Sequence, residues 1–305
     1  MRLKKILFAS TIVCFAIGFA SCKKDNNSNS STDTTTEAKT QADDQAFFSN
    51  ETDIATNDVN ASIDINGGSY NQTPAGINTP MLSLPCDATV TVDTTSNPRT
   101  ITINYNGNNC NLSRKRTGSV VVSFSPDFKW GTAQAQLTVK FVNFKVTRNA
   151  DGKSIVINGT RTITNVSGGL LRNLATLDSI EHKIDDTNMS ITFDNGAQRT
   201  WETHFTRVFT YNNGIVISTT GNISGKNRFN DDFSCTILQP LVIKQSCDFR
   251  LVSGQAVHTG AKVNATITFG LDINGSPVNS CPVLFYLKVV FTGSNGNTLS
   301  YLLPY

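Results

Sequence analysis

Histidines and adjacent carboxylates are the side chains of this sequence that could support acid–base catalysis or hold a metal. The histidines are His182, His204 and His258, and the adjacent aspartates are Asp185–Asp186 and Asp231–Asp232. A glycosidase needs two carboxyl groups held apart across a cleft, whereas adjacent aspartates in turns usually face solvent. The histidines lack the spacing of a metal site, and no Cys-x-x-Cys pair occurs. His204 lies in the polar phase of an alternating pattern, which predicts an exposed imidazole.

Nucleophilic catalysis has equally little support in the sequence. A serine hydrolase places its serine on a tight elbow beside a histidine base. The segment 221–225 does not have the Gly-x-Ser-x-Gly pattern, and no helix is predicted after it. The segments 64–67 and 272–275 resemble the start of a calcium loop but lack its later ligands, so they predict hairpin turns. We therefore expect a protein that is not an enzyme and holds no metal or cofactor, with an envelope hydrolase as an alternative.

Aromatic side chains offer a different chemistry, because exposed indole rings can stack on sugars. Trp130 and Trp201 are the two tryptophans, and with some of the 18 phenylalanines they could form a platform for a glycan. Large aromatic residues of a β-protein are also expected in the core, so burial is the competing interpretation. Nucleic acid is not expected as a partner, because the basic run at 114–116 is too short for a phosphate-binding face.

The first 21 residues have the parts of an export signal. Arg2, Lys4 and Lys5 precede an apolar run of about 15 residues, shorter than the ~20 that a membrane-spanning helix needs. Small residues then precede Cys22, and this arrangement resembles a bacterial lipoprotein signal, in which that cysteine receives the acyl chains. The predicted partner is therefore a membrane, bound through a lipid anchor at Cys22. An uncleaved N-terminal anchor and a plain secreted protein are the alternatives.

Residues 22–36 are rich in Asn, Ser and Thr and are predicted to form a disordered tether. Lys23 follows the anchor, which by resemblance to proteobacterial sorting favours the outer membrane, at its periplasmic face or at the cell surface. The formal charge is +3, and removal of residues 1–21 leaves equal numbers of basic and acidic side chains. Residues 22–60 hold three basic and eight acidic side chains, whereas residues 61–305 hold twenty and fifteen. This asymmetry favours docking of the acidic segment on the basic body.

Residues 37–62 are predicted to form one amphipathic helix. Phe47, Ile54, Val59 and Ile63 fall near the spacing of a helical stripe, and the acidic residues lie largely off it. We expect a structural helix packed on the following domain, and a movable lid over a cavity is the functional alternative.

Residues 63–305 are predicted to form an antiparallel β domain. Apolar residues recur at every second position, most clearly from Trp201 to Tyr211, so each strand is predicted to have one buried face and one solvent-exposed face. Asn-Gly turns at 195–196 and 213–214 are typical of hairpins. About a dozen long strands are expected, with a helical turn or a loop at 170–184. The predicted fold class is mainly β, as an antiparallel β-sandwich or an incomplete barrel.

Five cysteines follow Cys22, and an exported protein is expected to form disulfides. The predicted hairpin at 87–105 brings Cys86 close to Cys110, and Cys247 and Cys281 flank a second hairpin. Cys235 then becomes a buried free thiol. The rival pairing joins Cys235 to Cys247 and leaves Cys281 free.

Six segments of the chain match a known pattern: CKKD at 22–25, PCDATVTVD at 85–93, RTITINYNGNNC at 99–110, ITNVSGG at 163–169, DNGAQRTW at 194–201 and SCDFRLVSG at 246–254. Through these segments most of the chain resembles a large group of lipoproteins of the Bacteroidota that has no assigned activity. The resemblance implies a lipid-anchored envelope protein with an all-β body, and it implies no catalytic residue. Cys235 is extra to the cysteine pattern of the group, which implies that it is unpaired.

Three functions follow from these patterns. The first is a non-enzymatic binding or surface-interaction module, with a glycan as the candidate ligand, which requires Trp130 or Trp201 to face outward. The second is a carrier of lipid or another hydrophobic ligand, built as a half-open barrel with a helical lid over a deep apolar cavity. The third is the hydrolase, which requires converging carboxylates or a Ser–His contact.

Overall fold

The computed structural model describes residues 85–110, 112–149, 151–247, 250–261, 264–282, 284–292 and 298–304. It also describes helical residues at positions 47, 51, 52, 54–56, 58, 59, 62 and 63. The predicted signal peptide at 1–21, the tether at 22–36 and Cys22 lie outside the described residues.

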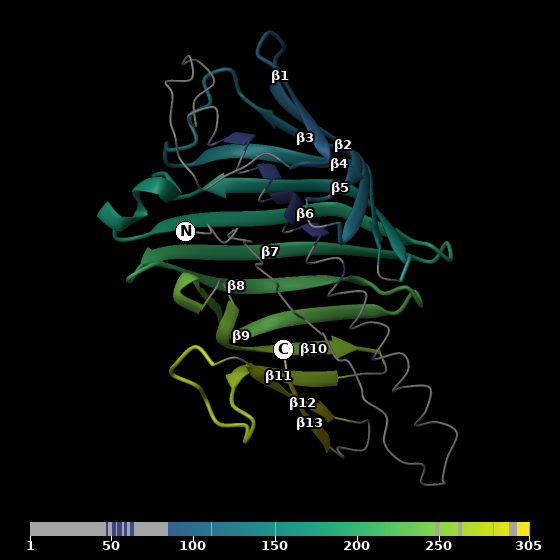
Figure 1. Ribbon diagram of the computed structural model, residues 1–305, viewed down its shortest axis with the longest axis vertical. Helices are drawn as coiled ribbons and strands as arrows, with labels where there is room; N and C mark the ends of the chain where they lie inside the picture. Colours follow the sequence, from purple (N-terminus) through teal and green to yellow (C-terminus); the bar gives the residue numbers. More distant parts are fainter. Residues whose placement is uncertain are drawn as a thin grey trace.

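Within these residues the body is one antiparallel sheet of 13 strands, in which each strand pairs with its neighbours in chain order (Figure 1). The first and last strands are not joined, so of the two predicted architectures the incomplete barrel is correct. The strands are β1 Ala88–Asp93, β2 Arg99–Asn108, β3 Arg114–Phe124, β4 Ala135–Arg148, β5 Ser154–Asn165, β6 Ile180–Phe193, β7 Gln198–Tyr211, β8 Ile215–Lys226, β9 Asp232–Lys244, β10 Arg250–Gly260, β11 Asn264–Leu271, β12 Tyr286–Thr292 and β13 Thr298–Pro304. Two short 3-10 segments are η1 Leu171–Thr176 and η2 Gln245–Cys247, and η1 accounts for the predicted turn at 170–184.

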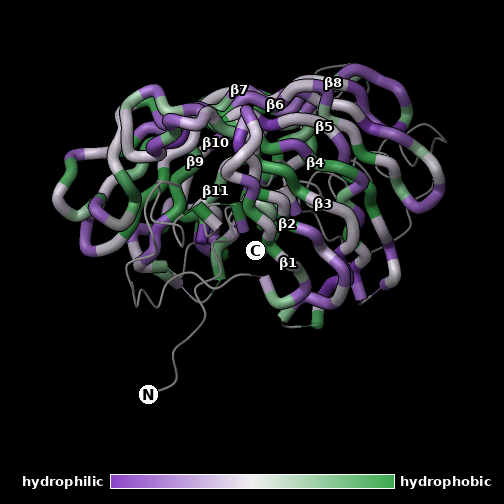
Figure 2. The backbone as a smooth tube through the Cα atoms, turned by 90° about the horizontal axis from the view of Figure 1, so that it is seen from above, coloured by the Kyte–Doolittle hydropathy of each residue, from purple (hydrophilic) through white to green (hydrophobic). Residues whose placement is uncertain are grey.

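Alternation along the strands gives the sheet an inner, buried face and an outer face. In β7 every second side chain from Arg199 to Phe209 is buried, while the residues between them are exposed or half-buried. The sheet is strongly curved, with β6 to β8 at the crown of an arch and β1, β2 and β11 below it (Figure 2). The inner face therefore lines the concave side, and its apolar side chains form one continuous core cluster.

Irregularities in the strand pairing accompany the curvature. The register shifts in the β3–β4 pair next to Gly118 and in the β8–β9 pair next to Gly221. Both glycines have positive φ angles, and a Cβ atom at either position would collide with the backbone of the neighbouring strand. Such bulges increase twist and bend a sheet, so these glycines permit the long strands to curve.

The helical residues between positions 47 and 63 pack on the inner face. Phe47, Ala55, Val59 and Ile63 are buried in the same core cluster as the sheet, whereas Ile54 of the predicted stripe is only half-buried. Among the described residues, no helix has the length and apolar character needed to cross a membrane.

Candidate functional site on the inner face of the sheet

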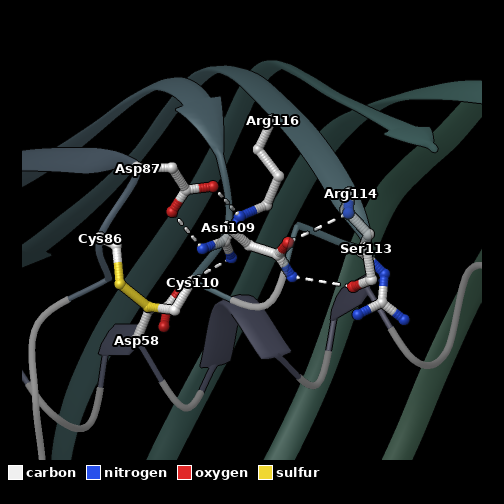
Figure 3. The surroundings of a disulfide bond; sticks show 8 residues. All are labelled: Asp58, Cys86, Asp87, Asn109, Cys110, Ser113, Arg114 and Arg116. Atoms are coloured by element: carbon white, nitrogen blue, oxygen red, sulfur yellow. Dashed lines mark hydrogen bonds and ion pairs between the residues drawn. A yellow bond between two sulfur atoms is a disulfide. The ribbon is translucent and has the colours of Figure 1, made fainter.

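The helix meets the sheet at a buried arginine shared by two carboxylates (Figure 3). Arg116 of β3 donates from Nε and Nη2 to Asp87 at 2.6 and 2.5 Å, and from Nη1 to Asp58 of the helix at 2.8 Å. The Tyr105 hydroxyl donates to the same Asp58 oxygen at 2.8 Å. Burial raises the pKa of Asp58, although Arg116 and Tyr105 oppose the rise. This network joins the helix to β2, β3 and the residue before β1.

The disulfide Cys86–Cys110 lies beside this network, with a Cα–Cα distance of 5.4 Å (Figure 3). It fixes the chain next to Asp87 against the end of β2. Asn109 adds two contacts in the connection to β3, because its side chain accepts from the Arg114 amide at 3.0 Å and donates to Ser113 at 3.1 Å. The covalent bond and the turn together position the carboxylate that holds Arg116.

A second ionic contact of the helix is formed by Glu51. Its Oε1 lies 2.6 Å from Nε of Arg114, and its side chain is 0% exposed. Burial raises the pKa of Glu51 to about 7, and the charges of Arg114 and Arg116 offset only part of that rise. Nearby, the guanidinium of Arg148 lies 4.6 Å from the ring centroid of Phe47. The expected docking of acidic helix on basic body is therefore confirmed, but Glu51 and Asp58 belong to the contact itself rather than to a polar outer side of the helix.

A row of polar side chains crosses the inner face next to the helix, and we call Arg161, Asp186 and Thr203 the paired row. They occupy directly opposed positions on β5, β6 and β7. Arg161 donates to both carboxylate oxygens of Asp186, at 2.7 and 2.9 Å, and to the hydroxyl of Thr56 on the helix at 2.9 Å. The charges of Arg161 and Asp186 are thus matched within the protein.

A second row crosses β5 to β8 four residues further along the strands. This polar row consists of Asn165, His182, Arg207 and Thr219, which are again directly opposed from strand to strand. All four are buried, with exposures of 0, 5, 8 and 1%.

Apolar rows lie on both sides of the polar row. Ile163, Ile184 and Phe205 lie on one side, and Ile180, Phe209, Ile217 and Ile243 on the other. The polar row is therefore a strip of hydrogen-bonding groups within an apolar surface.

His182 is the most constrained member of the polar row. Its ring lies between Trp130 and Phe209, with centroid distances of 5.1 and 5.0 Å. Burial lowers the pKa of His182 to about 4, and the charge of Arg207 adds to the effect, so the imidazole is neutral at physiological pH.

Two atoms of the polar row have no hydrogen-bond partner within the described part of the chain. Asn165 donates to the carbonyl oxygens of Trp130 and Gly169, at 2.7 and 2.9 Å, but its Oδ1 accepts nothing. Nε2 of His182 is the second such atom. A buried polar atom left without a partner typically costs about 1–3 kcal/mol, so the row lowers the stability of the fold.

The two tryptophans predicted as a ligand platform both lie inside the protein. Trp130 is 5% exposed and Trp201 is 2% exposed. They belong to different parts of the core, since Trp130 covers His182 and Trp201 occupies the centre of an alternating strand. An exposed aromatic stripe built on these residues is therefore not formed, and the outward orientation required for a glycan platform is wrong for both.

Asp185 and Asp186 are separated by the alternation of β6. Asp186 points to the inner face and binds Arg161, while Asp185 points outward and lies 2.8 Å from Nδ1 of His204. The His204 imidazole is exposed, as predicted. Asp232 is also exposed and pairs with Lys226 at 2.8 Å. Asp185 and Asp186 therefore do not converge, and no cluster of three potential metal ligands occurs among the described residues.

Both favoured disulfide pairings are confirmed. Cys247 and Cys281 are bonded with a Cα–Cα distance of 5.2 Å, as are Cys86 and Cys110. Cys235 is buried in β9 as expected, but it is itself disulfide-bonded, so the predicted free thiol is wrong.

At the described positions the helix and sheet side chains share one core under the helix. Surface depressions of about 440 and 650 Å³ occur elsewhere, at positions 188–225 and 97–138 respectively, and no helix residue lines them. The helix therefore occupies the concave space that a ligand would need.

The polar row was not identified from the sequence, although its signal is present. Arg207 falls in the buried phase of β7, between Phe205 and Phe209, and His182 falls in phase with Ile180 and Ile184. A basic residue and an imidazole in a buried phase are unusual enough to mark an interior site.

Comparison of the chain with protein-family models, with curated proteins and with solved structures finds no match.

Proposed function

We propose that this protein is a lipid-anchored envelope protein that carries a hydrophobic or amphiphilic ligand on the concave face of its sheet. The observation that supports it most directly is the combination of an unclosed 13-stranded sheet with a helix docked inside it. In this arrangement the helix is the lid that covers the concave face. Burial of both tryptophans makes the glycan-binding module the weaker candidate.

The helix contact has the character of a reversible one. Its ionic groups are Glu51 and Asp58, whose partners Arg114 and Arg116 stay on the sheet. Arg116 also keeps Asp87 when the helix leaves, so its charge stays compensated. Withdrawal of the helix would expose the apolar side chains of β2 to β5, where an acyl or alkyl chain could replace Val59 and Ile63.

The membrane anchor is the second part of the proposal. It rests on the export signal that ends at Cys22 and on the short apolar run before it. Acyl chains at this cysteine would hold the carrier at the outer membrane, close to lipid as a source or a destination of cargo. Labelling with a fatty-acid probe tests the anchor, because Cys22→Ser should abolish the label.

An apolar dye that fluoresces in hydrophobic surroundings tests the carrier directly. The full-length chain should bind N-phenyl-1-naphthylamine, and Val59→Ala should bind it at least threefold more tightly. Val59 is fully buried in the helix contact, so its truncation weakens docking of the lid. The matched control is Val92→Ala, the same change at a side chain that is 41% exposed on β1, which should bind like the parent.

Near-UV circular dichroism of each variant must match that of the parent, so that dye binding to a loosened core is not counted. The carrier proposal fails if neither the parent nor Val59→Ala binds the dye. It also fails if Val59→Ala and Val92→Ala bind with the same affinity, because the helix would then not compete with the ligand.

A further inference from the structure

We propose that the larger surface depression, on the outer face of β3 and β4, is a binding site for a neutral glycan. It has a volume of about 650 Å³ and is lined at positions 97–98, 123–125, 127–129, 132–136 and 138. This volume lies within the range of about 300–1,000 Å³ that is typical of small-molecule sites. The inference is independent of the carrier proposal, because the carrier uses the concave face and no described helix residue lines this depression. Neither tryptophan lines it, so the site does not depend on the platform that burial excludes.

The floor of the depression is the outer surface of two neighbouring strands. Ser123 of β3 and Thr138 of β4 are directly opposed, and both are half-buried. Gln136 lies on the same face of β4, and its Nε2 donates to the Thr164 hydroxyl of β5 at 3.1 Å. That bond holds the amide in place through one of its donors, and Oε1 of the same group can accept from a ligand hydroxyl. The floor therefore offers two hydroxyl groups and one oriented amide.

The two walls of the depression are held by contacts to the rest of the fold. The loop between β3 and β4 is anchored by Phe128 and Trp130, which are buried, and Asn165 donates to the Trp130 carbonyl oxygen at 2.7 Å. The opposite wall is the turn between β1 and β2, where the Ser96 hydroxyl donates to the Pro98 carbonyl oxygen at 2.8 Å. Walls that are already ordered reduce the entropy lost on binding, which favours recognition of a small ligand.

The lining favours a ligand that is polar but carries no net charge. Among the described residues that line the depression, only Asp127 and Lys129 are charged, and their charges have opposite signs. Seven of the other lining residues carry a hydroxyl or an amide group. Such groups both donate and accept hydrogen bonds, as the hydroxyl groups of a sugar do. Pro98 and Ala133 add small apolar surfaces that suit the C–H face of a sugar ring.

A peptide and an alkyl chain fit this depression less well. Peptides commonly bind β-proteins by adding a strand at an open sheet edge. β3 pairs with β2 and β4, and β4 pairs with β3 and β5, so the floor offers side chains rather than an open edge. An alkyl chain requires accessible apolar surface, and the two large aromatic residues of the lining, Phe124 and Phe128, are only 3 and 6% exposed.

Isothermal titration calorimetry of the full-length chain with trisaccharides tests the site. The neutral probes are cellotriose, maltotriose, xylotriose and N-acetylchitotriose. Trigalacturonate and chitotriose are the anionic and cationic comparisons, and trialanine is the peptide comparison. At least one neutral trisaccharide should bind with a Kd of about 1 mM or tighter. Each charged trisaccharide should bind at least threefold more weakly than the best neutral one, because the lining has no net charge to attract it.

Substitutions then locate the binding. Thr138→Val removes the hydroxyl group but keeps the shape of the side chain, and should weaken binding of the best neutral trisaccharide about threefold or more. Thr192→Val is the matched control, because it makes the same change at a half-buried position on the outer face of β6, and it should bind like the parent. Ala133→Trp places a large ring at an exposed position of the lining and should abolish binding.

The outcomes separate this inference from the carrier proposal. The inference is wrong if no neutral trisaccharide binds the parent at up to about 10 mM, or if trialanine or a charged trisaccharide binds best. It is also wrong if Thr138→Val binds the sugar as Thr192→Val does, or if Ala133→Trp binds it like the parent, because the site would then lie elsewhere. None of these results changes the dye binding that tests the carrier, which concerns the opposite face of the sheet.

Discussion

Glu51→Gln tests whether the helix contact contains a carboxyl group that burial makes difficult to ionise. Glutamine keeps the size of the side chain and the oxygen that Arg114 contacts at 2.6 Å, but it carries no titratable proton. The pKa of Glu51 in the folded protein is about 7, above the reference value of 4.5. Between these two pH values the folded chain binds more protons than the unfolded chain.

The sign follows from proton linkage. The stability that protonated Glu51 contributes is complete below pH 4.5 and is lost as the pH rises through about 7. A shift of this size corresponds to about 3 kcal/mol of unfolding free energy. Because glutamine mimics the protonated form, the free energy of unfolding of the variant minus that of the parent should increase by about 3 kcal/mol from pH 4.5 to pH 7 and then stay constant.

Urea unfolding of both proteins at several pH values between 4.5 and 8.5 measures this difference. The difference is needed because His182 and His258 have pKa values lowered to about 4, so they change stability in the opposite direction over part of the range. Their contribution is the same in both proteins and cancels. Glu202→Gln, at an exposed position on the outer face of β7, is the control and should show no such trend.

A difference that does not vary with pH would show that Glu51 titrates normally. A variant that becomes relatively less stable above pH 7 would show that ionised Glu51 and Arg114 form a net stabilising pair. Either result would refute the reasoning that burial outweighs the attraction of the arginine at this position.

Three further predictions concern the core and the disulfides. His182→Phe should make the fold less sensitive to acid, because the stability that comes from the neutral imidazole is present above pH 6.5 and is lost as the pH falls to about 4. The unfolding free energies of parent and variant, measured in urea, should diverge by about 3 kcal/mol over that pH window. Parallel pH curves would contradict the lowered pKa of His182. Cys86→Ser with Cys110→Ser should lower the unfolding free energy by about 2–4 kcal/mol, measured in urea under non-reducing conditions, and an unchanged midpoint would argue that the bond does not constrain the unfolded chain. Trp130→Ala should lower the unfolding free energy by about 3–5 kcal/mol in the same assay, because the indole ring is buried against His182. A loss below about 1 kcal/mol would mean that the surrounding loop fills the space left by the ring.

The sequence predicted the local structure well because hairpins depend on short-range signals. Alternation along β7, the turn before Gly214 and the pairing of Cys86 with Cys110 follow from residues close together in the chain. The choice between a sandwich and an open sheet does not, since both present the same alternation. The choice between these architectures depends partly on bulges such as the one at Gly118. The presence of a glycine in a strand does not determine which residue of the neighbouring strand lies opposite it.

The candidate site is harder to predict because residue type and strand phase can point to different faces of the sheet. Trp201 has the residue type of an exposed ligand platform, but it lies in phase with Phe205 and Phe209 and is buried with them. The apolar stripe of the helix places Glu51 and Asp58 on its polar side. The stripe gives no information about the arginines on the sheet surface that the helix contacts. Only the tertiary contact with Arg114 and Arg116 reveals that these acids point inward.

Folding alone gives no account of the polar row. Apolar side chains of similar size at buried positions are usually as stabilising as a buried charged group, and often more so. Asn165 and His182 each bury an atom with no described partner, whereas Arg161 and Asp186, on the same two strands, satisfy one another. The same sheet can therefore build a matched polar row where the requirement is structural. In the polar row, Oδ1 of Asn165 and Nε2 of His182 each lack a partner among the described residues, and a buried polar atom of this kind typically costs about 1–3 kcal/mol of stability.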